Sequence, residues 1–172
     1  MSSSPSGDLA GRLLGVSELH GDFVLSSGTR STVYFDKFRF LAEPELLREL
    51  AVAVRKLLPP DVTHLASPEG AATLLLAAVS LDTGLPLAVV RKEPKTYGTM
   101  SQVEGYAPPE ARVALIEDVS TTGRQVLAAA RAIEGEGPEV AAIILALDRG
   151  GADALRGAGY EVRAVISLRP QP

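Results

Sequence analysis

The chain has 172 residues, of which 46% are hydrophobic and 22% are charged, as is typical of a single globular domain. A formal net charge of −4 argues against general nucleic-acid binding, which usually needs a basic face. Because cysteine is absent, the chain has no disulfide, no thiolate metal site and no cysteine nucleophile. No apolar stretch is long enough to span a bilayer, and the N-terminus lacks the basic and apolar parts of a signal peptide. We therefore expect a cytoplasmic protein that does not bind membranes.

The N-terminal region falls outside the pattern of the rest of the chain. Residues 1–7 are rich in Ser, Pro and Gly, and we expect them to be disordered. A short helix that ends near Gly15 is expected to precede two strands, 21–28 and 31–37, which a turn joins. Residues 9–40 would then form a small hood built on a hairpin.

From residue 44 onward, helical and strand patterns alternate. Pro44 is expected to begin a helix, because proline suits the first helical position and an acidic residue follows it. Gly84 is expected to end the next helix in a left-handed conformation. The expected helices are 44–58, 71–82, 125–134 and 152–156, and the expected strands are 62–66, 87–90, 113–118, 140–147 and 160–166. This alternation predicts one α/β domain over residues 1–172, with a parallel sheet of about five strands flanked by helices.

The junction between the strand at 113–118 and the helix after it carries the clearest chemistry. The strand begins with an apolar run, which is typical of a strand buried on both faces of a sheet. Small hydroxyl residues and Gly123 follow, and then the helix begins. Its first turn has unpaired N–H groups and the positive end of the helix dipole, while Gly123 lets a ligand approach the backbone. The junction therefore predicts a site for one phosphate group.

Two adjacent acidic residues, Glu117 and Asp118, refine this prediction. Carboxylates beside a phosphate site would repel a bare phosphate, but they would bind hydroxyl groups or a cation on the same ligand. A ribose 5-phosphate satisfies both requirements, with its phosphate on the helix and its 2- and 3-hydroxyls on the acids. A strand-end acidic pair before an ordinary helix cap is the alternative for the pair taken alone. The run lacks the Gly-Lys-Ser/Thr ending of a Walker P-loop.

Residues 91–109 form a long segment with no helix or strand signal, which is uncommon in compact domains unless the segment has a function. Arg91, Lys92 and Lys95 place three cations within five positions of an acidic chain. Such a cluster suits a polyphosphate, although a charge run is more often solvated surface. Open parallel sheets bind ligands beyond the carboxyl ends of their strands. We therefore expect this loop to meet residues 67–70, 117–124 and 148–151 at that edge.

Four segments together resemble the orotate phosphoribosyltransferase family, whose members have the type I phosphoribosyltransferase fold. The run Glu117–Gly123 resembles the motif of that fold for phosphoribosyl pyrophosphate (PRPP). Arg91–Gly105 resembles the family's mobile catalytic loop, which would occupy residues 91–109 here. Residues 21–36 and Leu147–Arg149 resemble its N-terminal region and its orotate-carboxylate segment. The resemblance runs from about residue 21 to residue 168 in the order of the family.

The resemblance implies transfer of the phosphoribosyl group from PRPP to orotate, giving orotidine 5-phosphate and pyrophosphate in UMP biosynthesis. It implies Mg²⁺ as the cofactor, bound through PRPP oxygens, with Asp118 as an alternative protein ligand. It also implies a homodimer in which the Arg91–Gly105 loop reaches the neighbouring site.

The resemblance assigns roles to individual residues as well. It assigns PRPP binding to Arg91, Lys92, Lys95, Tyr97, Glu117, Asp118, Val119, Ser120, Thr121, Thr122, Gly123, Arg124 and Gln125. It assigns catalysis to Lys95, Asp118 and Tyr97. It assigns the pyrophosphate loop to Ser67, Pro68, Glu69 and Gly70. It assigns orotate binding to Thr121, Arg149 and Phe35, with a core aromatic residue as the alternative for Phe35.

Two positions depart from the family pattern. Tyr97 stands where the family usually has histidine, and a tyrosine there would hydrogen-bond rather than donate a proton readily. Glu69 places a carboxylate in the pyrophosphate loop, where it would either point away or approach Mg²⁺. His20 and His64 have no metal-ligand spacing around them and are expected to be structural, and Asp148 is expected to be a strand-end cap.

Two other functions stay open at this point. The first is a phosphoribosyltransferase that uses another nucleobase. The second is a non-catalytic PRPP-sensing regulator on the same fold, which would normally need a DNA-binding segment or a basic face.

Overall fold

The computed structural model describes residues 5–24, 28–95 and 101–168. Its backbone divides into two compact units, Met1–Glu49 and Leu50–Pro172. The prediction of one domain over residues 1–172 stays a prediction.

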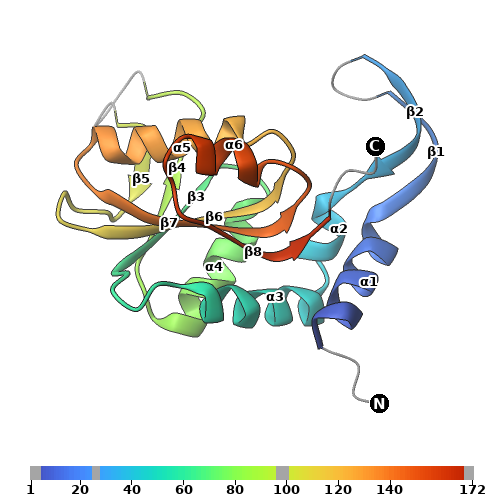
Figure 1. Cartoon of the computed structure of the whole chain (residues 1–172), viewed down its shortest axis with the longest axis horizontal. Coiled ribbons are helices and arrows are strands. Elements are labelled where there is room, and N and C mark those ends of the chain that lie inside the picture. Colours follow the sequence, from blue (N-terminus) through green and yellow to red (C-terminus); the bar gives the residue numbers. More distant parts are fainter. Residues whose placement is uncertain (1–4, 25–27, 96–100, 169–172) are drawn as a thin grey trace. The chain divides into compact units, whose positions relative to one another are not determined.

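The N-terminal unit contains a two-stranded antiparallel sheet and short helices (Figure 1). Its elements are α1 (Pro5–Ser17), β1 (Glu18–Val24), β2 (Arg30–Phe35), α2 (Lys37–Leu41) and the start of α3 (Pro44–Leu57). The Asp36 carboxylate begins α2 by accepting the Phe38 amide at 3.0 Å. Its apolar interior includes Leu13 and Phe40, both fully buried.

The expected hairpin is present, but several boundaries in this unit differ from the prediction. α1 begins at Pro5, within the stretch 1–7 that is expected to be disordered, and residues 1–4 lie outside the described residues. α1 also runs past Gly15 to Ser17, and the first strand begins three residues earlier than expected, at Glu18. Helix α2 was not predicted, since five residues are too few for a helical repeat to show.

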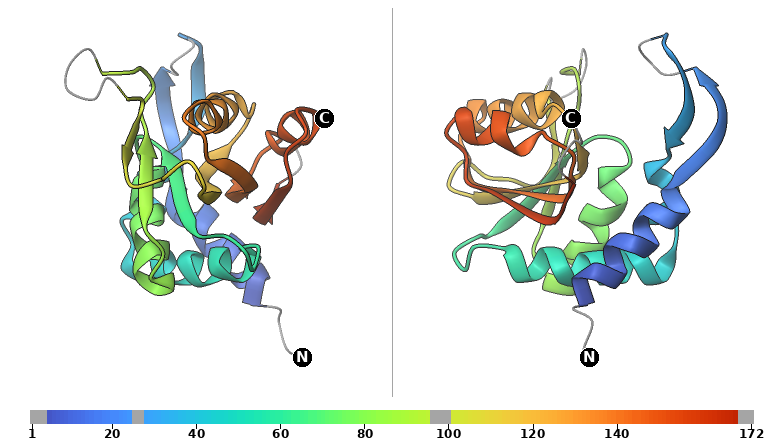
Figure 2. Two further views of the ribbon diagram at one scale, coloured as in Figure 1. Left: turned by 90° about the vertical axis from the view of Figure 1, so that its left-hand side faces the viewer. Right: turned by 45° about the vertical axis from the view of Figure 1, so that its right-hand side comes forward.

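The second unit is built on a six-stranded sheet in the order β5-β4-β3-β6-β7-β8. Its strands are β3 (His64–Pro68), β4 (Leu87–Val90), β5 (Val103–Gly105), β6 (Arg112–Ser120), β7 (Glu139–Asp148) and β8 (Val162–Ser167). All neighbours pair in parallel except β5, which is antiparallel to β4. Helices α5 (Arg124–Gly135) and α6 (Ala152–Gly157) cover one face of the sheet, and α4 (Ala72–Thr83) lies on the other (Figures 1 and 2).

The central strands β6 and β7 form the core of this unit, because strands flank them on both sides and helices cover both faces. Leu115, Ile143 and Leu145 are fully buried there against Val126 and Ile133 of α5. Each such leucine or isoleucine contributes about 1.5–3 kcal/mol to folding through its burial. The strands β3, β4 and β6 are therefore held in place up to their carboxyl ends by a well-packed core.

The predicted alternation of helices and strands is present, with two differences. The sheet has six strands instead of about five, because β5 lies within the segment expected to have no secondary structure. β3 begins later than expected and includes Ser67 and Pro68, which had been assigned to a loop. Gly84 ends α4 at φ 73°, as predicted. Among the described residues, no helix is both long and apolar enough to cross a membrane.

Candidate active site

The turn from β6 into α5 forms a small pocket of about 110 Å³. It is lined by Glu117, Val119, Ser120, Thr121, Thr122, Gly123, Arg124, Gln125 and Val126. Thr121 and Thr122 are exposed, and Gly123 is the N-cap of α5 with φ 74°. The first amides of α5 and these hydroxyls are donors at the positive end of a twelve-residue helix. This arrangement suits a phosphate group.

Two glycines allow this turn to pack tightly against the segment that follows β7. A side chain on Gly123 would lie 2.9 Å from the Gly151 carbonyl oxygen, and one on Gly151 would overlap Ser120 Oγ. The Arg149 amide also donates to the Ser120 carbonyl at 2.8 Å. Asp148 caps the same segment by accepting the amides of Gly150 and Ala152, as predicted. Arg149 is therefore held next to the phosphate-sized pocket.

The two acidic residues at the end of β6 have different surroundings. Glu117 lines the pocket and is 3% exposed, whereas Asp118 is fully buried and is absent from the pocket lining. Successive side chains of a strand point to opposite faces, which accounts for this difference. The Asp118 carboxylate accepts the Val119 amide at 2.6 Å. Glu117 is the acidic residue that lines the pocket, and its Oε1 accepts the Asp118 amide at 3.1 Å.

A second, larger pocket of about 280 Å³ lies where β3 and β4 end beside α5. It is lined by Pro68, Val90, Arg91, Lys92, Gln102, Gln125, Ala128 and Ala129. Arg91 and Lys92 supply positive charge, and Gln125 lines this pocket as well as the smaller one. Cationic side chains here suit the polyphosphate end of a ligand whose other phosphate binds at the β6–α5 turn.

Glu69 connects the end of β3 to the start of the loop that follows β4. Its carboxylate accepts the Lys92 amide at 2.8 Å, and its own amide donates to the Val90 carbonyl at 2.8 Å. Gln125 Nε2 donates to the Glu69 carbonyl at 3.5 Å. The carboxylate is thus engaged with loop backbone.

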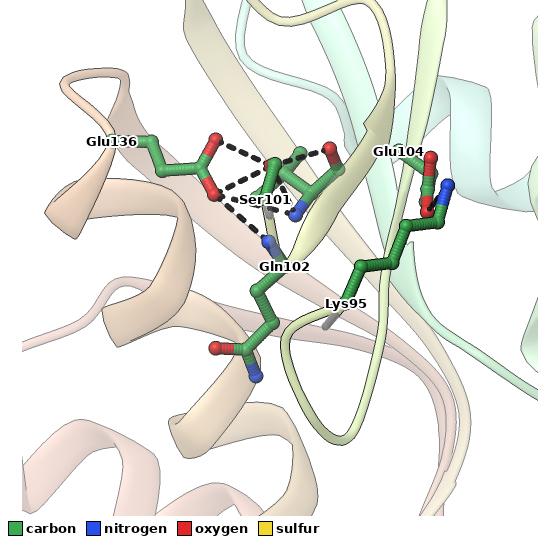
Figure 3. Close-up of polar contacts among 6 residues, drawn as sticks. Lys95, Ser101, Gln102, Glu104 and Glu136 are labelled. Carbon is green, nitrogen blue, oxygen red and sulfur yellow. Dashed lines mark hydrogen bonds and ion pairs between the residues drawn. The ribbon is translucent and has the colours of Figure 1, made fainter. Parts of the chain in front are cut away.

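Lys95 lies on the same loop and is held by residues that follow it (Figure 3). Its ammonium group pairs with Glu104 Oε1 at 2.5 Å, and its amide donates to the Ser101 carbonyl at 3.4 Å. The Arg91 amide donates to the Gln102 carbonyl, and Gln102 Nε2 donates back to the Arg91 carbonyl. The two arms of the loop are therefore joined close to the larger pocket.

No family model matches the chain. A curated relative, the orotate phosphoribosyltransferase of Thermococcus gammatolerans, is 41% identical over 155 residues, which cover 87% of this chain and 82% of the relative. That of a Nocardioides species is 41% identical over 161 residues, which cover 92% and 90%. The chain belongs to the orotate phosphoribosyltransferase family. A solved structure of the Mycobacterium tuberculosis orotate phosphoribosyltransferase in complex with PRPP has a TM-score of 0.80 at 27% identity, covering 95% of this chain and 96% of that one.

Membership of the orotate phosphoribosyltransferase family confirms the predicted family and fold class. The structure brings most of the predicted PRPP residues to the two pockets, which share Gln125. Tyr97 lies outside the described residues, and Phe35 lies in the N-terminal unit, with its ring centroid 6.3 Å from that of Phe40. The individual roles of these residues stay predictions. Gln102 lines the larger pocket but was not assigned a site role, although it belongs to the loop motif.

The acidic residue at the site fits a magnesium ion that is bound together with a phosphorylated ligand. Within residues 5–24, 28–95 and 101–168, no group of three or more His, Asp or Glu residues forms a metal cage. Glu117 nevertheless lines the pocket and could supply a carboxylate oxygen. Mg²⁺ usually binds through one or two carboxylates, water and substrate phosphates, so Glu117 together with the phosphates of a ligand fits this ion.

The two histidines have local partners, as a structural role would require. His20 Nε2 lies 3.1 Å from Glu18 Oε1, and the His64 ring nitrogen Nδ1 lies 2.9 Å from Thr63 Oγ1. The ring of His64 also packs on that of Tyr106, with a centroid distance of 5.5 Å.

Proposed function

We propose that the protein is an orotate phosphoribosyltransferase, which forms orotidine 5-phosphate and pyrophosphate from PRPP and orotate. The observation that carries this proposal is the pairing of two pockets that share Gln125, in a chain that belongs to this family. One pocket has helix-terminus donors and a carboxylate, and the other has Arg91 and Lys92. PRPP carries a single phosphate, a diol and a pyrophosphate, which suit the helix-terminus donors, the carboxylate and the two cations respectively.

PRPP would bind with its 5-phosphate at residues 120–125 and its ribose hydroxyls on Glu117. Its pyrophosphate would then lie against Arg91 and Lys92 in the larger pocket. The carboxylate of Glu69 would not repel it there, because that carboxylate accepts the Lys92 amide. Orotate would meet Thr121 and Arg149, whose backbones lie on neighbouring segments joined through Ser120.

The chemical step is displacement of pyrophosphate at the anomeric carbon by a ring nitrogen of orotate. The carbon–oxygen bond to pyrophosphate breaks and the carbon–nitrogen bond forms, while the sugar takes on oxocarbenium character. The protein would hold the reactants in line and stabilise the charge that grows on the leaving group. Bound Mg²⁺ would supply Lewis-acid stabilisation of the same charge. Lys95 would act on the pyrophosphate after leaving Glu104.

The same proposal extends to the assembly and location of the enzyme. In this family the catalytic loop reaches the neighbouring subunit's site, so the active form would be a homodimer. An enzyme of UMP biosynthesis would act in the cytoplasm.

A direct assay would follow the loss of orotate absorbance with PRPP, with and without Mg²⁺. Turnover with orotate, and little with other nucleobases, is the expected result. Turnover with a purine in its place would identify a sister activity. PRPP binding without turnover on any base would instead identify a regulator.

Replacing Lys95 tests the mechanism in the same assay. Loss of a cation that stabilises the leaving group should lower kcat roughly 100-fold or more in Lys95→Ala. Because Lys95 is on a loop, the variant should unfold at the same urea concentration as the wild type. Lys56→Ala, which removes an exposed lysine from α3, is the control and should keep the wild-type rate. A near-normal kcat for Lys95→Ala would exclude this role.

A further inference from the structure

Glu136, the residue directly after α5, binds the returning arm of the Lys95 loop (Figure 3). The Ser101 hydroxyl donates to its carboxylate, whose two oxygens lie 2.8 and 3.0 Å from Ser101 Oγ. It also accepts the amides of Gln102 at 3.2 Å and Val103 at 3.3 Å. A single side chain thus takes donors from three consecutive residues, 101–103. We call this set of hydrogen bonds the Glu136 clamp.

The stability of α5 does not account for a carboxylate at this position. The C-terminal end of a helix carries partial negative charge, so an acidic residue there is unfavourable and a basic one would be favourable. The last turn of α5 has no basic residue and contains Glu134 as well. The contacts of Glu136 with the loop compensate for this placement, which points to a role in the loop.

The Glu136 clamp includes one of the two residues that hold Lys95 and is adjacent in sequence to the other. Ser101, whose hydroxyl is in the clamp, accepts the Lys95 amide through its carbonyl. Glu104, which pairs with the Lys95 ammonium group, directly follows Val103. Fixing residues 101–103 therefore fixes the backbone and the side-chain partner of Lys95 together.

The clamp also reaches the cationic edge of the larger pocket. Gln102, whose amide is in the clamp, donates through Nε2 to the Arg91 carbonyl at 2.8 Å and to the Lys92 carbonyl at 3.3 Å. Arg91 and Lys92 both line that pocket. Loss of the clamp would therefore loosen the outgoing arm of the loop as well as the returning one.

We propose that Glu136 is a positioning residue for phosphoribosyl transfer, acting through residues 101–103 on Lys95. This inference rests on the proposed function of the site. It assigns a catalytic consequence to an exposed residue that lies outside both pockets. Glu136 lines neither pocket, so its carboxylate would not touch substrate; it holds residues 101–103, next to the Glu104 that Lys95 leaves in order to act.

Three variants test this role. Glu136→Ala removes the acceptor, Glu136→Gln keeps one acceptor oxygen, and Glu110→Ala removes an exposed carboxylate that takes no part in the clamp. Two quantities would be measured for each: kcat and KM for PRPP and orotate, and hydrogen exchange at the amides of Gln102 and Val103. The exchange rates report the clamp without requiring activity.

Glu136→Ala should lower kcat about tenfold and speed exchange at the Gln102 amide, because its hydrogen bond to a charged group is lost. Exchange at the Val103 amide should change less, because that amide also donates to Ser101 Oγ at 2.9 Å. Its KM for orotate should stay within about twofold of the wild type, since the loss falls on the transition state. Glu136→Gln should recover most of the rate, and Glu110→Ala should match the wild type.

A Glu136→Ala enzyme with wild-type kcat, whether or not exchange is faster, would overturn the positioning role alone. A wild-type enzyme that is inactive with every nucleobase would overturn the proposed function and the positioning role together. The exchange rates would still differ between the variants in that second case, so the two failures are distinguishable.

Discussion

Gly123 and Gly84 adopt nearly the same backbone conformation, with φ of 74° and 73°, but in different surroundings. A side chain on Gly84 would meet no atom within 4 Å, whereas one on Gly123 would lie 2.9 Å from the Gly151 carbonyl oxygen and 3.1 Å from Leu155 Cγ. An alanine at position 84 would therefore bear only the free-energy cost of the left-handed conformation. An alanine at position 123 would bear that cost and also the cost of the close contact with the Gly151 segment, beside the smaller pocket.

Gly84→Ala should lower the free energy of unfolding by about 1–2 kcal/mol, the cost of a left-handed residue with a side chain. Gly123→Ala should lower it further, because the Gly151 segment must move. That movement should also raise KM for PRPP in Gly123→Ala and leave it unchanged in Gly84→Ala. Urea unfolding and steady-state kinetics would check both values. Equal losses of stability in the two variants would contradict the close contact.

The residues of the site differ in how far the sequence alone predicts their contacts. The phosphate-sized turn is predictable because its chemistry lies in one continuous run, Glu117–Gln125. The direction of the Glu69 carboxylate is not, since its partner, the Lys92 amide, comes from another part of the chain. Glu136 is missed for the same reason: its three donors lie more than 30 residues away, and no local pattern marks it.

At the scale of elements, Tyr160 connects the segment before β8 to α5. Its hydroxyl donates to Glu134 at 2.7 Å. The pKa of Tyr160 is raised from 10.0 to about 12. Partial burial is the largest cause, and the hydrogen bond to Glu134 and the negative charge of Glu134 add to it. The folded protein therefore keeps the phenolic proton at pH values where the unfolded chain has lost it.

The contribution of this contact to stability should depend on pH. A pKa that is raised on folding gives stability that is complete below pH 10 and is lost as the pH rises toward 12. The difference in free energy of unfolding between the wild type and Tyr160→Phe should therefore shrink between pH 9 and pH 12. Urea unfolding at several pH values in about that range would measure it. A difference that is independent of pH would contradict the raised pKa.

The sequence predicted long elements better than short ones. β6, β7, α4 and α5 show clear apolar runs or helical faces, and their observed bounds are within a few residues of the expected ones. β5 has only three residues, too few for an alternating pattern, and exists because it pairs with the edge of β4. Its register depends on Gly105, whose Cβ would lie 2.7 Å from the Leu87 carbonyl oxygen.

At the scale of the whole molecule, the outer face of α4 is a candidate for the proposed dimer contact. Leu74, Ala77 and Leu81 lie on one face of the helix, and all three are exposed. Leu74 is 41% exposed and Leu81 is 88% exposed, so the face presents a contiguous apolar surface instead of a single exposed side chain. A second copy of the chain would remove this face from water.

Leu81→Glu should weaken the proposed homodimer, because the charge would be buried without a partner if the dimer contact lies on this face of α4. We expect the dissociation constant of the dimer to rise at least about tenfold, whereas Leu81→Met, which keeps the apolar surface, should leave it unchanged. Sedimentation equilibrium would measure both. A wild-type protein that is monomeric at micromolar concentration would overturn the homodimer, and an intact Leu81→Glu dimer would move the contact elsewhere.

Helix α5 has a phosphate-sized turn at its first residue and the Glu136 clamp just past its last. Twelve residues of α-helix span about 18 Å and do not shorten or stretch appreciably. Because the helix is stiff, a displacement of its first turn along the axis would also displace its last turn. One helix therefore joins the proposed phosphate site to the residue that holds the Lys95 loop, so any displacement of α5 along its axis would move both.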